Sequence, residues 1–490
     1  MKSIAIIGAG VSGMTAAIYC LKSGFDVTVY EKHNKSGGLC SGWKRNGYSF
    51  EGAVHWINDS ETNDPMYRLW SETGILGNGV ELFRSDPYFV YNYNGTDICV
   101  YRDIDRLKAH WLEISPDDKK AIEMLYHDVQ AIRRIKIPLM DIPGLKARNK
   151  SHPDIPLLLS MAPGIIKLPR LLKYSAQEYA AAFKHPGIQK TLGEFIVYKK
   201  FGSLSLLHTM ACYMDSGVYP KWGSLDLGKR MENKIKTLRG RMVFNTKVDK
   251  IIFDGNKACG LEINGEKIPF DAVIVSQDLL TVRNLLDRPL KDRWILAAKE
   301  YPPVQTTYAT IGVRDDLGDL PFAFAFNEDI NVGGFQYDYI ALTNYAQHTA
   351  YAPDGCTSLT CSFTGDSYEY WNERRKNGTY DEQKQKLANE LRRLIEKNMP
   401  RLKDKIEVIN IATPLTYERY TGSYKGAWMT ILEKNKIPPA QRSISAAYRR
   451  LYFAGFRTRA PGGLPVAMLS GFRASQYLCR DFRMVFEGAV

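Results

Sequence analysis

The apolar positions near the N-terminus change their period twice. Ile4 to Ile7 form a continuous apolar run of strand type, and a glycine-rich stretch follows directly. The next apolar positions repeat at i, i+3, i+4 and i+7, as on one face of a helix: Met14, Ala17, Ile18 and Leu21. Gly24 is placed to end that helix before a second apolar run, Val27 to Tyr30. The pattern predicts strand, glycine turn, helix and strand.

Later apolar runs predict further strands. Asn264-Gly265 joins two strand-like runs, which is typical of a short hairpin. Ala272 to Ser276 reads as another buried strand. Leu451 to Gly455 is also apolar and ends in glycine, and a Pro-Gly-Gly turn and a helix from Val466 onward follow it. Strands alternating with helices indicate an α/β fold.

The glycine turn has the spacing of a phosphate cradle. Gly8 permits a tight turn, Gly10 lets the backbone approach a pyrophosphate, and Gly13 lets the helix pack closely on the strand. Val11 and Ser12 open the helix, whose N-terminus supplies amide donors and a positive dipole. Because the motif stands between a predicted strand and a predicted helix, it predicts a Rossmann-type dinucleotide site.

Glu31 ends the second predicted strand. An acid at this position can accept hydrogen bonds from an adenosine ribose and would repel a 2′-phosphate, so the site favours FAD or NAD over NADP. The alternative is a solvated acid at a strand end. Lys32 to Cys40 follow, and the paired glycines Gly37-Gly38 with Leu39 would let this loop lie against a pyrophosphate or a ribityl chain, which a plain NAD site does not need.

Four motifs resemble one group of flavoproteins. They are the N-terminal stretch with its paired glycines and Gly47 to His55, the turn from Gly217 to Gly223, the stretch from Thr413 to Ala427, and Leu451 to Gly455 with Pro461 to Pro465. The sequence is similar to the group of phytoene desaturases, carotenoid isomerases and retinol saturase. Trp222 stands where the group's Tyr-Pro-x-Gly-Gly turn has glycine. The resemblance implies non-covalent FAD.

The resemblance also implies roles for residues outside the glycine turn. Met242 to Val248 would be a strand that places the Val248 backbone against the cofactor, and Thr413 to Ala427 a return strand of the substrate domain. Gly455 would end a strand beside the flavin, and the amides near Leu464, Pro465 and Val466 would stabilise negative charge on the reduced ring. The alternative for this last turn is an ordinary βα turn packed in a core.

The expected architecture is therefore discontinuous. A Rossmann-type FAD-binding domain of the GDP-dissociation-inhibitor and amine-oxidase kind takes residues 1–85, 215–290 and 430–490. An α+β substrate domain takes residues 86–214 and 291–429. At 490 residues, two interleaved domains are each large enough to bury a core. The chain shows no second glycine fingerprint, so we expect no separate nicotinamide domain.

The chain has a net charge of +13, and its excess of basic residues is concentrated between residues 131 and 172. Basic residues there alternate with apolar blocks: Arg133, Arg134, Lys136, Lys146, Arg148 and Lys150. Ile155 to Leu172 is apolar over about the length of a membrane span, but three prolines disfavour a spanning helix. The pattern favours a surface that rests on an anionic membrane. The alternative is ordinary helices packed on the substrate domain.

The N-terminal sequence, the cysteines and the basic residues bear on the location of the protein, on metals and on nucleic-acid partners. The start Met-Lys-Ser enters a strand at once, so we expect a cytoplasmic protein, with peripheral contact to the inner face of the membrane through 131–172. The eight cysteines form neither a Cys-x-x-Cys pair nor a cluster at zinc spacing, so no metal is expected. No nucleic-acid module accompanies the basic cluster, and nucleic acid is not an expected partner. The oligomeric state stays open.

His55 is the candidate catalytic residue, because the resemblance aligns it with a histidine of the retinol saturase-like members. The alternative is a histidine that is hydrogen-bonded within the flavin domain. Tyr219 and Tyr420 also lie in the matched motifs, but a tyrosine with a packed ring and a hydrogen-bonded hydroxyl explains each of them equally well. The resemblance implies an FAD-dependent oxidoreductase that desaturates, saturates or isomerises carbon–carbon double bonds in a carotenoid, retinoid or other lipid. A fatty-acid isomerase, an amine oxidase and a non-enzymatic lipid carrier stay open.

Overall fold

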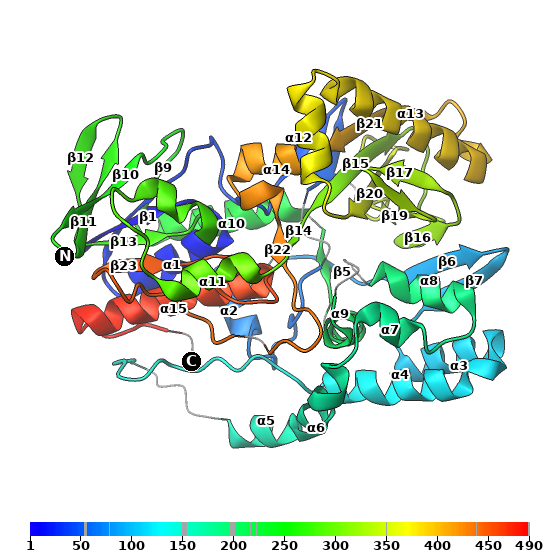
Figure 1. Ribbon diagram of the computed structural model, residues 1–490, viewed down its shortest axis with the longest axis horizontal. Helices are drawn as coiled ribbons and strands as arrows, with labels where there is room; N and C mark the ends of the chain where they lie inside the picture. Colours follow the sequence, from blue (N-terminus) through cyan, green and yellow to red (C-terminus); the bar gives the residue numbers. More distant parts are fainter. Residues whose placement is uncertain are drawn as a thin grey trace.

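The structure of the protein is a computed structural model. The structure describes residues 1–52, 56–77, 79–148, 154–195, 201–215, 217–221, 223–348, 350–437 and 439–488. Two bodies lie side by side in Figure 1, one around a parallel sheet near the N-terminus and the other around a larger mixed sheet.

The first body is built on a five-stranded parallel sheet in the order β23-β13-β1-β2-β9. Its strands are β1 (Ser3–Ile7), β2 (Asp26–Tyr30), β9 (Arg241–Val243), β13 (Ala272–Val275) and β23 (Leu451–Phe453). Strands β1, β2, β13 and β23 are short and largely buried on both faces, as parallel strands require, whereas the edge strand β9 is partly exposed. This order, third-second-first-fourth-fifth along the chain, is that of the Rossmann fold.

Helices cover this sheet closely. They are α1 (Val11–Lys22), α10 (Gly223–Thr237) and α15 (Leu464–Phe482), with α2 (Tyr67–Glu72) and α11 (Arg293–Ala297) nearby. A Cβ on Gly471 of α15 would lie 2.2 Å from the carbonyl oxygen of Ser12, so glycine sets how near α15 approaches α1. Gly24 ends α1 as predicted, with a φ of +86°.

Small sheets complete the first body. The predicted hairpin is confirmed, since Asn264 and Gly265 both take positive φ between β11 and β12. The strands are β10 (Lys250–Asp254), β11 (Lys257–Ile263), β12 (Glu266–Pro269), β3 (Gly42–Arg45) and β4 (Tyr48–Glu51). Two pairs join distant stretches of the chain: β5 (Leu82–Phe83) with β8 (Tyr219–Pro220), and β14 (Pro303–Val304) with β22 (Met429–Thr430).

The second body holds a seven-stranded mixed sheet in the order β21-β15-β20-β19-β16-β6-β7. Its strands are β6 (Phe89–Tyr93), β7 (Thr96–Val100), β15 (Thr306–Val313), β16 (Ala323–Phe326), β19 (Ile340–Asn344), β20 (Thr357–Thr364) and β21 (Ile406–Ala412). A hairpin of β17 (Ile330–Val332) and β18 (Phe335–Tyr337) lies beside it. Because β6 pairs with β16, stretches on either side of the 215–290 segment share one sheet.

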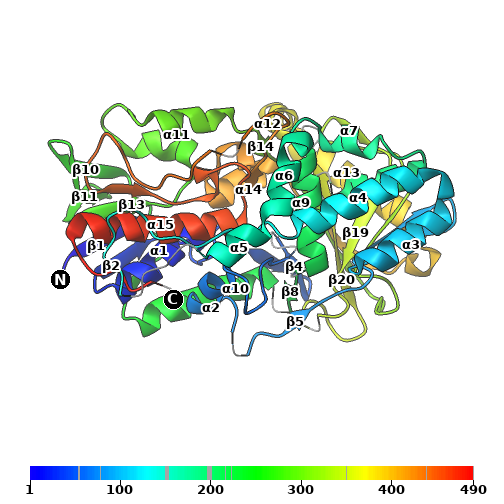
Figure 2. The same ribbon diagram turned by 90° about the horizontal axis from the view of Figure 1, so that it is seen from below.

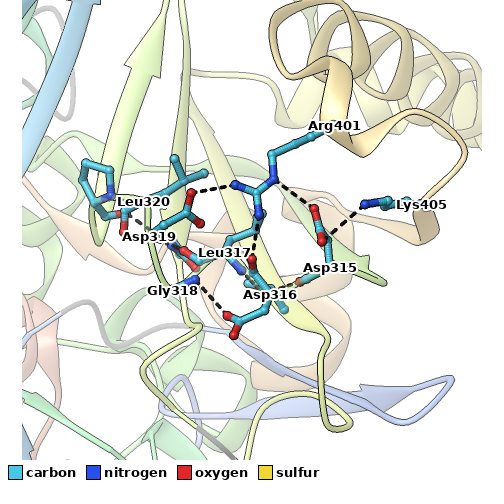
Figure 3. A network of polar contacts seen from close by, with 11 residues as sticks. Asp315, Asp316, Leu317, Gly318, Asp319, Leu320, Arg401 and Lys405 are labelled. Carbon is cyan, nitrogen blue, oxygen red and sulfur yellow. Dashed lines mark hydrogen bonds and ion pairs between the residues drawn. The ribbon is translucent and has the colours of Figure 1, made fainter.

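Helices α12 (Tyr368–Lys376) and α13 (Tyr380–Asn398) pack near this sheet, and the chain leaves α13 through the turn 400–402. Figure 3 shows how that turn is held. The Arg401 guanidinium bonds Asp315 at 3.0 Å and Asp319 at 2.6 Å, and Lys405 lies 3.3 Å from Asp315. This network ties the turn to the loop after β15.

A helical layer forms the remaining side of the second body. Its helices are α3 (Ile104–Ile114), α4 (Lys119–Ile132), α5 (Ile155–Ser160), α6 (Ala162–Leu171), α7 (Ala176–Ala180), α8 (Pro186–Glu194) and α9 (Ser203–Asp215). Figure 1 places α5 and α6 along the lower edge, and Figure 2, seen from below, turns them toward the reader. In α8, the Ile188 and Leu192 side chains are both buried.

One predicted strand is wrong, and another is shorter than predicted. Thr413 to Ala427 begins with a helix, α14 (Pro414–Thr421), because the Thr413 backbone N–H is bonded by the Thr416 side chain and proline occupies the first helical position. The strand predicted over Met242 to Val248 ends at Val243, since Asn245 takes a φ of +52° and leaves the extended conformation. The last helix begins at Leu464, two residues before the predicted Val466.

Candidate active site

One cavity of about 1750 Å³ runs between the two bodies. One end is lined by the turn before α1, the 30–43 segment, the 246–249 segment and the loops that follow β13 and β23. The other end is lined by α4, α6 and α9, with Trp428, Leu432 and Ile437. We call the first part the cofactor end and the second the apolar arm.

The cofactor end brings together nearly all residues predicted to bind a cofactor. Those on its lining are Gly8, Gly10, Val11, Ser12, Glu31, Lys32, Gly38, Leu39, Val248, Gly455, Leu464, Pro465 and Val466. Gly13 does not line the cavity. A Cβ there would lie 2.1 Å from the Gly8 carbonyl oxygen, so Gly13 is needed for the close approach of α1 to the turn. His55 lies outside the described residues.

Gly10 is the position where space is left for a ligand. Its φ of −73° suits any residue, and a Cβ there would meet only the Cα of Gly38, at 3.9 Å. The amides of Val11, Ser12 and Gly13 open α1, where backbone N–H groups have no intrahelical partner. Since the protein itself leaves this space free, the turn fits a phosphate group approached by backbone donors.

Glu31 stands beside the same turn. Its Oε2 accepts from the Ala9 amide at 2.8 Å, and its Oε1 accepts from the His33 amide at 3.0 Å. The Glu31 backbone is fixed by bonds to Val243 and Thr246 on the β9 side. Each carboxylate oxygen can accept a further hydrogen bond, so the acid is positioned to take the hydroxyl groups of a ribose.

An ion pair below the C-terminal loop was missed by sequence reasoning. The Arg457 guanidinium bonds both oxygens of Asp278, at 2.7 and 2.8 Å, and both side chains are 1% exposed. Asp278 also accepts from the amides of Leu280 and Tyr424. The pair therefore joins the loop after β13 to the loop after β23. The only sequence signal for this ion pair was that Asp278 and Arg457 each follow a predicted strand by a few residues.

The N-terminus of α15 faces the same end. Gly463 precedes the helix with a φ of +131°, and a Cβ there would meet no atom within 4 Å. Leu464 and Val466 follow it on the cavity wall. A helix N-terminus presents amide donors and positive potential, which favour an anionic group. The placement suits the role that the sequence suggested for these amides.

The apolar arm is lined mainly by aliphatic side chains from α4, α6 and α9 and from non-helical segments, which are far apart in the sequence. They are Ile132, Ile135, Ile137, Leu168, Leu172, Leu204 and Ile437. Among the described lining residues of α4, α6 and α9, the titratable side chains are His208 and Cys212. Cys212 Sγ lies 3.5 Å from His208 Nε2, and the Asn58 amide donates to the sulfur at 3.6 Å.

The electrostatics of the arm centre on this pair. The neighbouring Cys212 sulfur raises the pKa of His208 to about 9, with a smaller contribution from Asp59. Sequence reasoning missed the pair, although His-x-x-x-Cys places the two side chains on one face of a helix.

The two tyrosines singled out earlier lie in different settings. The Tyr219 hydroxyl is buried and donates to Glu51 at 2.6 Å, away from the cavity lining. Burial raises its pKa well above the usual value. Tyr420 lines the cavity but is 53% exposed, with its ring 5.8 Å from that of His33. Neither tyrosine stands in the apolar arm.

Two properties of the described part of the chain bear on membranes and metals. No helix there combines the length and apolar character needed to cross a bilayer. No group of three or more His, Cys, Asp or Glu side chains within the described ranges has an arrangement that could hold a metal ion.

Comparison with known proteins gives a consistent result. The family described as flavin containing amine oxidoreductase matches residues 11–479. The chain is similar to 1-hydroxycarotenoid 3,4-desaturase from a Flavobacterium species, with 22% identity over 96% of this chain and 97% of the relative. It is also similar to 4,4′-diapophytoene desaturase (4,4′-diaponeurosporene-forming) of Staphylococcus aureus, with 24% identity over 95% and 96%.

Solved structures show the same fold. Putrescine oxidase bound to putrescine is similar with a TM-score of 0.63 and 15% identity over 97% of this chain and 98% of that chain. Cyclohexylamine oxidase from Brevibacterium oxydans is similar with a TM-score of 0.59 and 14% identity over 98% and 99%. The sheet order and these likenesses agree on the fold class that the sequence predicted.

Proposed function

Since the chain belongs to the family of flavin-containing amine oxidoreductases, and is an oxidoreductase with FAD as its cofactor, we propose that it alters carbon–carbon double bonds in a long apolar substrate. The observation that supports this is the continuity of the cavity. The cofactor end opens directly into an arm lined by aliphatic side chains. A chain of hydrocarbon placed there would bury its surface against leucine and isoleucine.

The residues of the cofactor end would hold FAD in an extended position. Gly10, Val11 and Ser12 would receive the pyrophosphate, and Glu31 the adenosine ribose. The amides near Leu464 and Val466 would face the ring. When bound, FAD supplies the hydride acceptor, or the donor in the opposite direction. The protein orients the substrate, excludes water and stabilises negative charge through α15.

The relatives support this class of substrate. The two desaturases named above act on carotenoids or their precursors by their names, and they match nearly the whole chain. An amine substrate is the alternative within the same family. A cationic amine calls for a negative or aromatic contact. The arm has an aromatic side chain in Trp428, but the described α4, α6 and α9 residues on it include no carboxylate. The absence of a carboxylate from these helices supports an olefin over an amine.

A panel assay tests the proposal. FAD-loaded protein is incubated without oxygen, once oxidised and once chemically reduced, with 4,4′-diapophytoene, retinol, oleic acid, putrescine and cyclohexylamine. We expect at least one olefin to change its double bonds, as seen by mass spectrometry and absorbance, while the amines leave the flavin unchanged. Bleaching by amines alone would replace this proposal with an amine oxidase. Unchanged olefins in both redox states would overturn it.

We propose further that α5 and α6 rest on an anionic bilayer from which the substrate enters. Exposed aliphatic side chains gather on these two helices: Ile155, Leu158, Leu159, Ile165 and Ile166. Leu168 and Leu172, which follow the exposed residues in the chain, line the apolar arm, so α6 contributes to both the patch and the cavity wall. Arg134, Lys146 and Lys173 are exposed close by in the chain. Basic residues beside an apolar surface suit anionic lipid.

The charges contribute less to this surface than the sequence suggested. Arg133 bonds Asp215 at 2.7 Å, and Arg148 lies 3.2 Å from Glu487. Lys136 lies 2.9 Å from Asp64. Because these three cations already have acidic partners, the exposed apolar side chains of α5 and α6 are expected to provide most of the affinity.

A further inference from the structure

The His208–Cys212 pair is the titratable part of the α9 face that lines the apolar arm, where Ser205 and Thr209 are further polar residues. Both side chains of the pair are half-buried, and both contribute to the cavity wall. They stand one helical turn apart on α9, with Nε2 and Sγ 3.5 Å apart. The Asn58 side chain, from the 56–60 segment, donates to the same sulfur. The pair is therefore held from two elements and is open to whatever occupies the arm.

Charged groups surround the pair on its protein side. They come from the 58–64 segment, the end of α9 and the segment after α4: Asp59, Asp64, Asp215, Arg133 and Lys136. Asp59 favours a protonated His208, and Lys136 opposes it. Lys136 lies 3.7 Å from Asp59 and 2.9 Å from Asp64, and Arg133 bonds Asp215. Apart from the pair, these charges largely offset one another.

A change in a carbon–carbon double bond moves a proton as well as a hydride. The flavin accounts for the hydride, but an aliphatic wall can neither take nor give a proton. Resting on the function proposed above, we propose that His208 and Cys212 are the catalytic pair that exchanges this proton with the substrate. A sulfur and an imidazole within hydrogen-bond reach are suited to this, because either can hold the proton while the other stabilises the resulting charge.

The step balances in each direction. In a desaturation, FAD bound at the cofactor end would supply the acceptor for the hydride of one carbon, while the neighbouring C–H bond breaks so that its electron pair forms the new double bond. The proton from that bond passes to the thiolate of Cys212, and water removes it later through His208. In a saturation the proton passes from the pair to carbon. In an isomerisation the pair protonates one carbon and deprotonates another, with no net oxidation.

The chain offers a matched control outside the cavity. His110 and Cys99 are also half-buried and adjacent, and His110 Nε2 accepts from the Cys99 backbone amide at 3.0 Å. Burial raises the pKa of Cys99 and lowers that of His110. Neither residue lines the cavity. His110→Gln therefore changes a comparable histidine without touching the arm.

Thiol alkylation tests the pair without requiring turnover. Purified FAD-loaded protein is treated with iodoacetamide between pH 6 and 9, and the modification of Cys212 and of Cys99 is read from the same digest by mass spectrometry. We expect Cys212 to react faster at pH 7 than Cys99, since burial raises the pKa of Cys99, whereas the His208 imidazole lies within reach to take the proton of the Cys212 thiol. His208→Gln should slow Cys212 about tenfold or more, while His110→Gln should not. Equal rates in wild type and His208→Gln would overturn the proposal.

Turnover tests the role itself. With 4,4′-diapophytoene as substrate, His208→Gln and Cys212→Ser should each lower kcat by about a hundredfold or more, the usual contribution of general acid–base catalysis. Their FAD content and melting temperature should stay at the wild-type level, and His110→Gln should keep full activity. A wild type that leaves this olefin unchanged would count against the proposed function, while the alkylation result would still decide whether the pair is activated. A kcat within about twofold of wild type in both variants would refute the catalytic role.

Discussion

The two ends of the cavity are built in different ways. The cofactor end is formed largely by backbone, through the turn at Gly8 to Gly10, the paired glycines and the N-terminus of α15. The apolar arm is formed by side chains from α4, α6, α9 and the segment around Trp428. A dinucleotide site thus depends on local chain geometry, whereas the substrate site depends on packing between distant segments.

Two buried aspartates, Asp278 on the lining of the cofactor end and Asp128 on α4 outside the cavity lining, differ in their partners. Asp278 and Arg457 are both 1% exposed. Asp128 is fully buried on α4, but its partners Lys167 and Arg170 on α6 are 30% and 41% exposed. The Tyr179 hydroxyl also donates to Asp128, at 2.9 Å. Without Asp278, the Arg457 guanidinium would be buried with no acidic partner. Without Asp128, Lys167 and Arg170 could still reach water.

The largest expected effect follows from this difference. Asp278→Ala leaves Arg457 buried and unpaired, and we expect the free energy of unfolding to fall by about 3–5 kcal/mol. Asp128→Ala should cost about 1–3 kcal/mol, because Lys167 and Arg170 can turn toward solvent. Urea unfolding followed by circular dichroism measures both. Equal losses at the two sites would contradict the contrast in burial.

The next effect separates binding of FAD from folding. Gly10→Val places a side chain where the protein leaves room, so the fold should persist while FAD binding weakens at least about a hundredfold, roughly 2.8 kcal/mol. Leu204→Ala, in the arm, should keep its FAD. Flavin absorbance per chain after gel filtration gives the comparison. If Gly10→Val folds and retains full flavin absorbance, the cradle has been assigned to the wrong place.

A smaller effect concerns the apolar patch. The double change Ile165→Asp and Ile166→Asp should weaken flotation with anionic vesicles by about tenfold, or roughly 1.4 kcal/mol, without loss of FAD. Leu296→Asp on α11 is the matched control, since Leu296 is a comparably exposed aliphatic side chain. Removing the charges of Arg133, Arg134, Lys146 and Arg148 should have a smaller effect. The membrane proposal fails if wild type does not float at low ionic strength.

The smallest effect lies outside the cavity. Arg401→Ala breaks the network of Figure 3, but Arg401 is 41% exposed, as part of a surface network. We expect a loss below about 1 kcal/mol and no change in FAD content or turnover. Thermal unfolding and flavin absorbance measure this. A loss as large as that of Asp278→Ala would show that surface pairs stabilise this protein more than burial suggests.

Local patterns account for what could be predicted from the sequence. Strand, glycine turn and helix follow within the first thirty residues, and Gly8, Gly10 and Glu31 meet because the motif is continuous in the chain. Errors arose where a local signal was overlooked. Thr413-Pro414 with Thr416 is a helix start, and Asn245 interrupts an apolar run that otherwise resembles a strand.

The arm could not be predicted in the same way. Asn58 and Cys212 are separated by more than a hundred residues, and their contact depends on how α9 lies against the 56–60 segment. Asp278 and Arg457 likewise meet only because β13 and β23 are neighbours in the sheet. Neither contact leaves a periodic signal, because the pattern of apolar positions records burial and not the partner.

The central claim is tested most directly by a single turnover without oxygen. Protein loaded with oxidised FAD is mixed with an equal amount of 4,4′-diapophytoene, and the visible absorbance of the flavin and the mass of the extracted polyene are followed together. The account predicts that each flavin reduced corresponds to one polyene that has lost two hydrogens, and that chemically reduced protein runs the change in reverse or isomerises the polyene. A flavin that stays oxidised beside an unchanged polyene, and a reduced flavin that changes nothing, would contradict it.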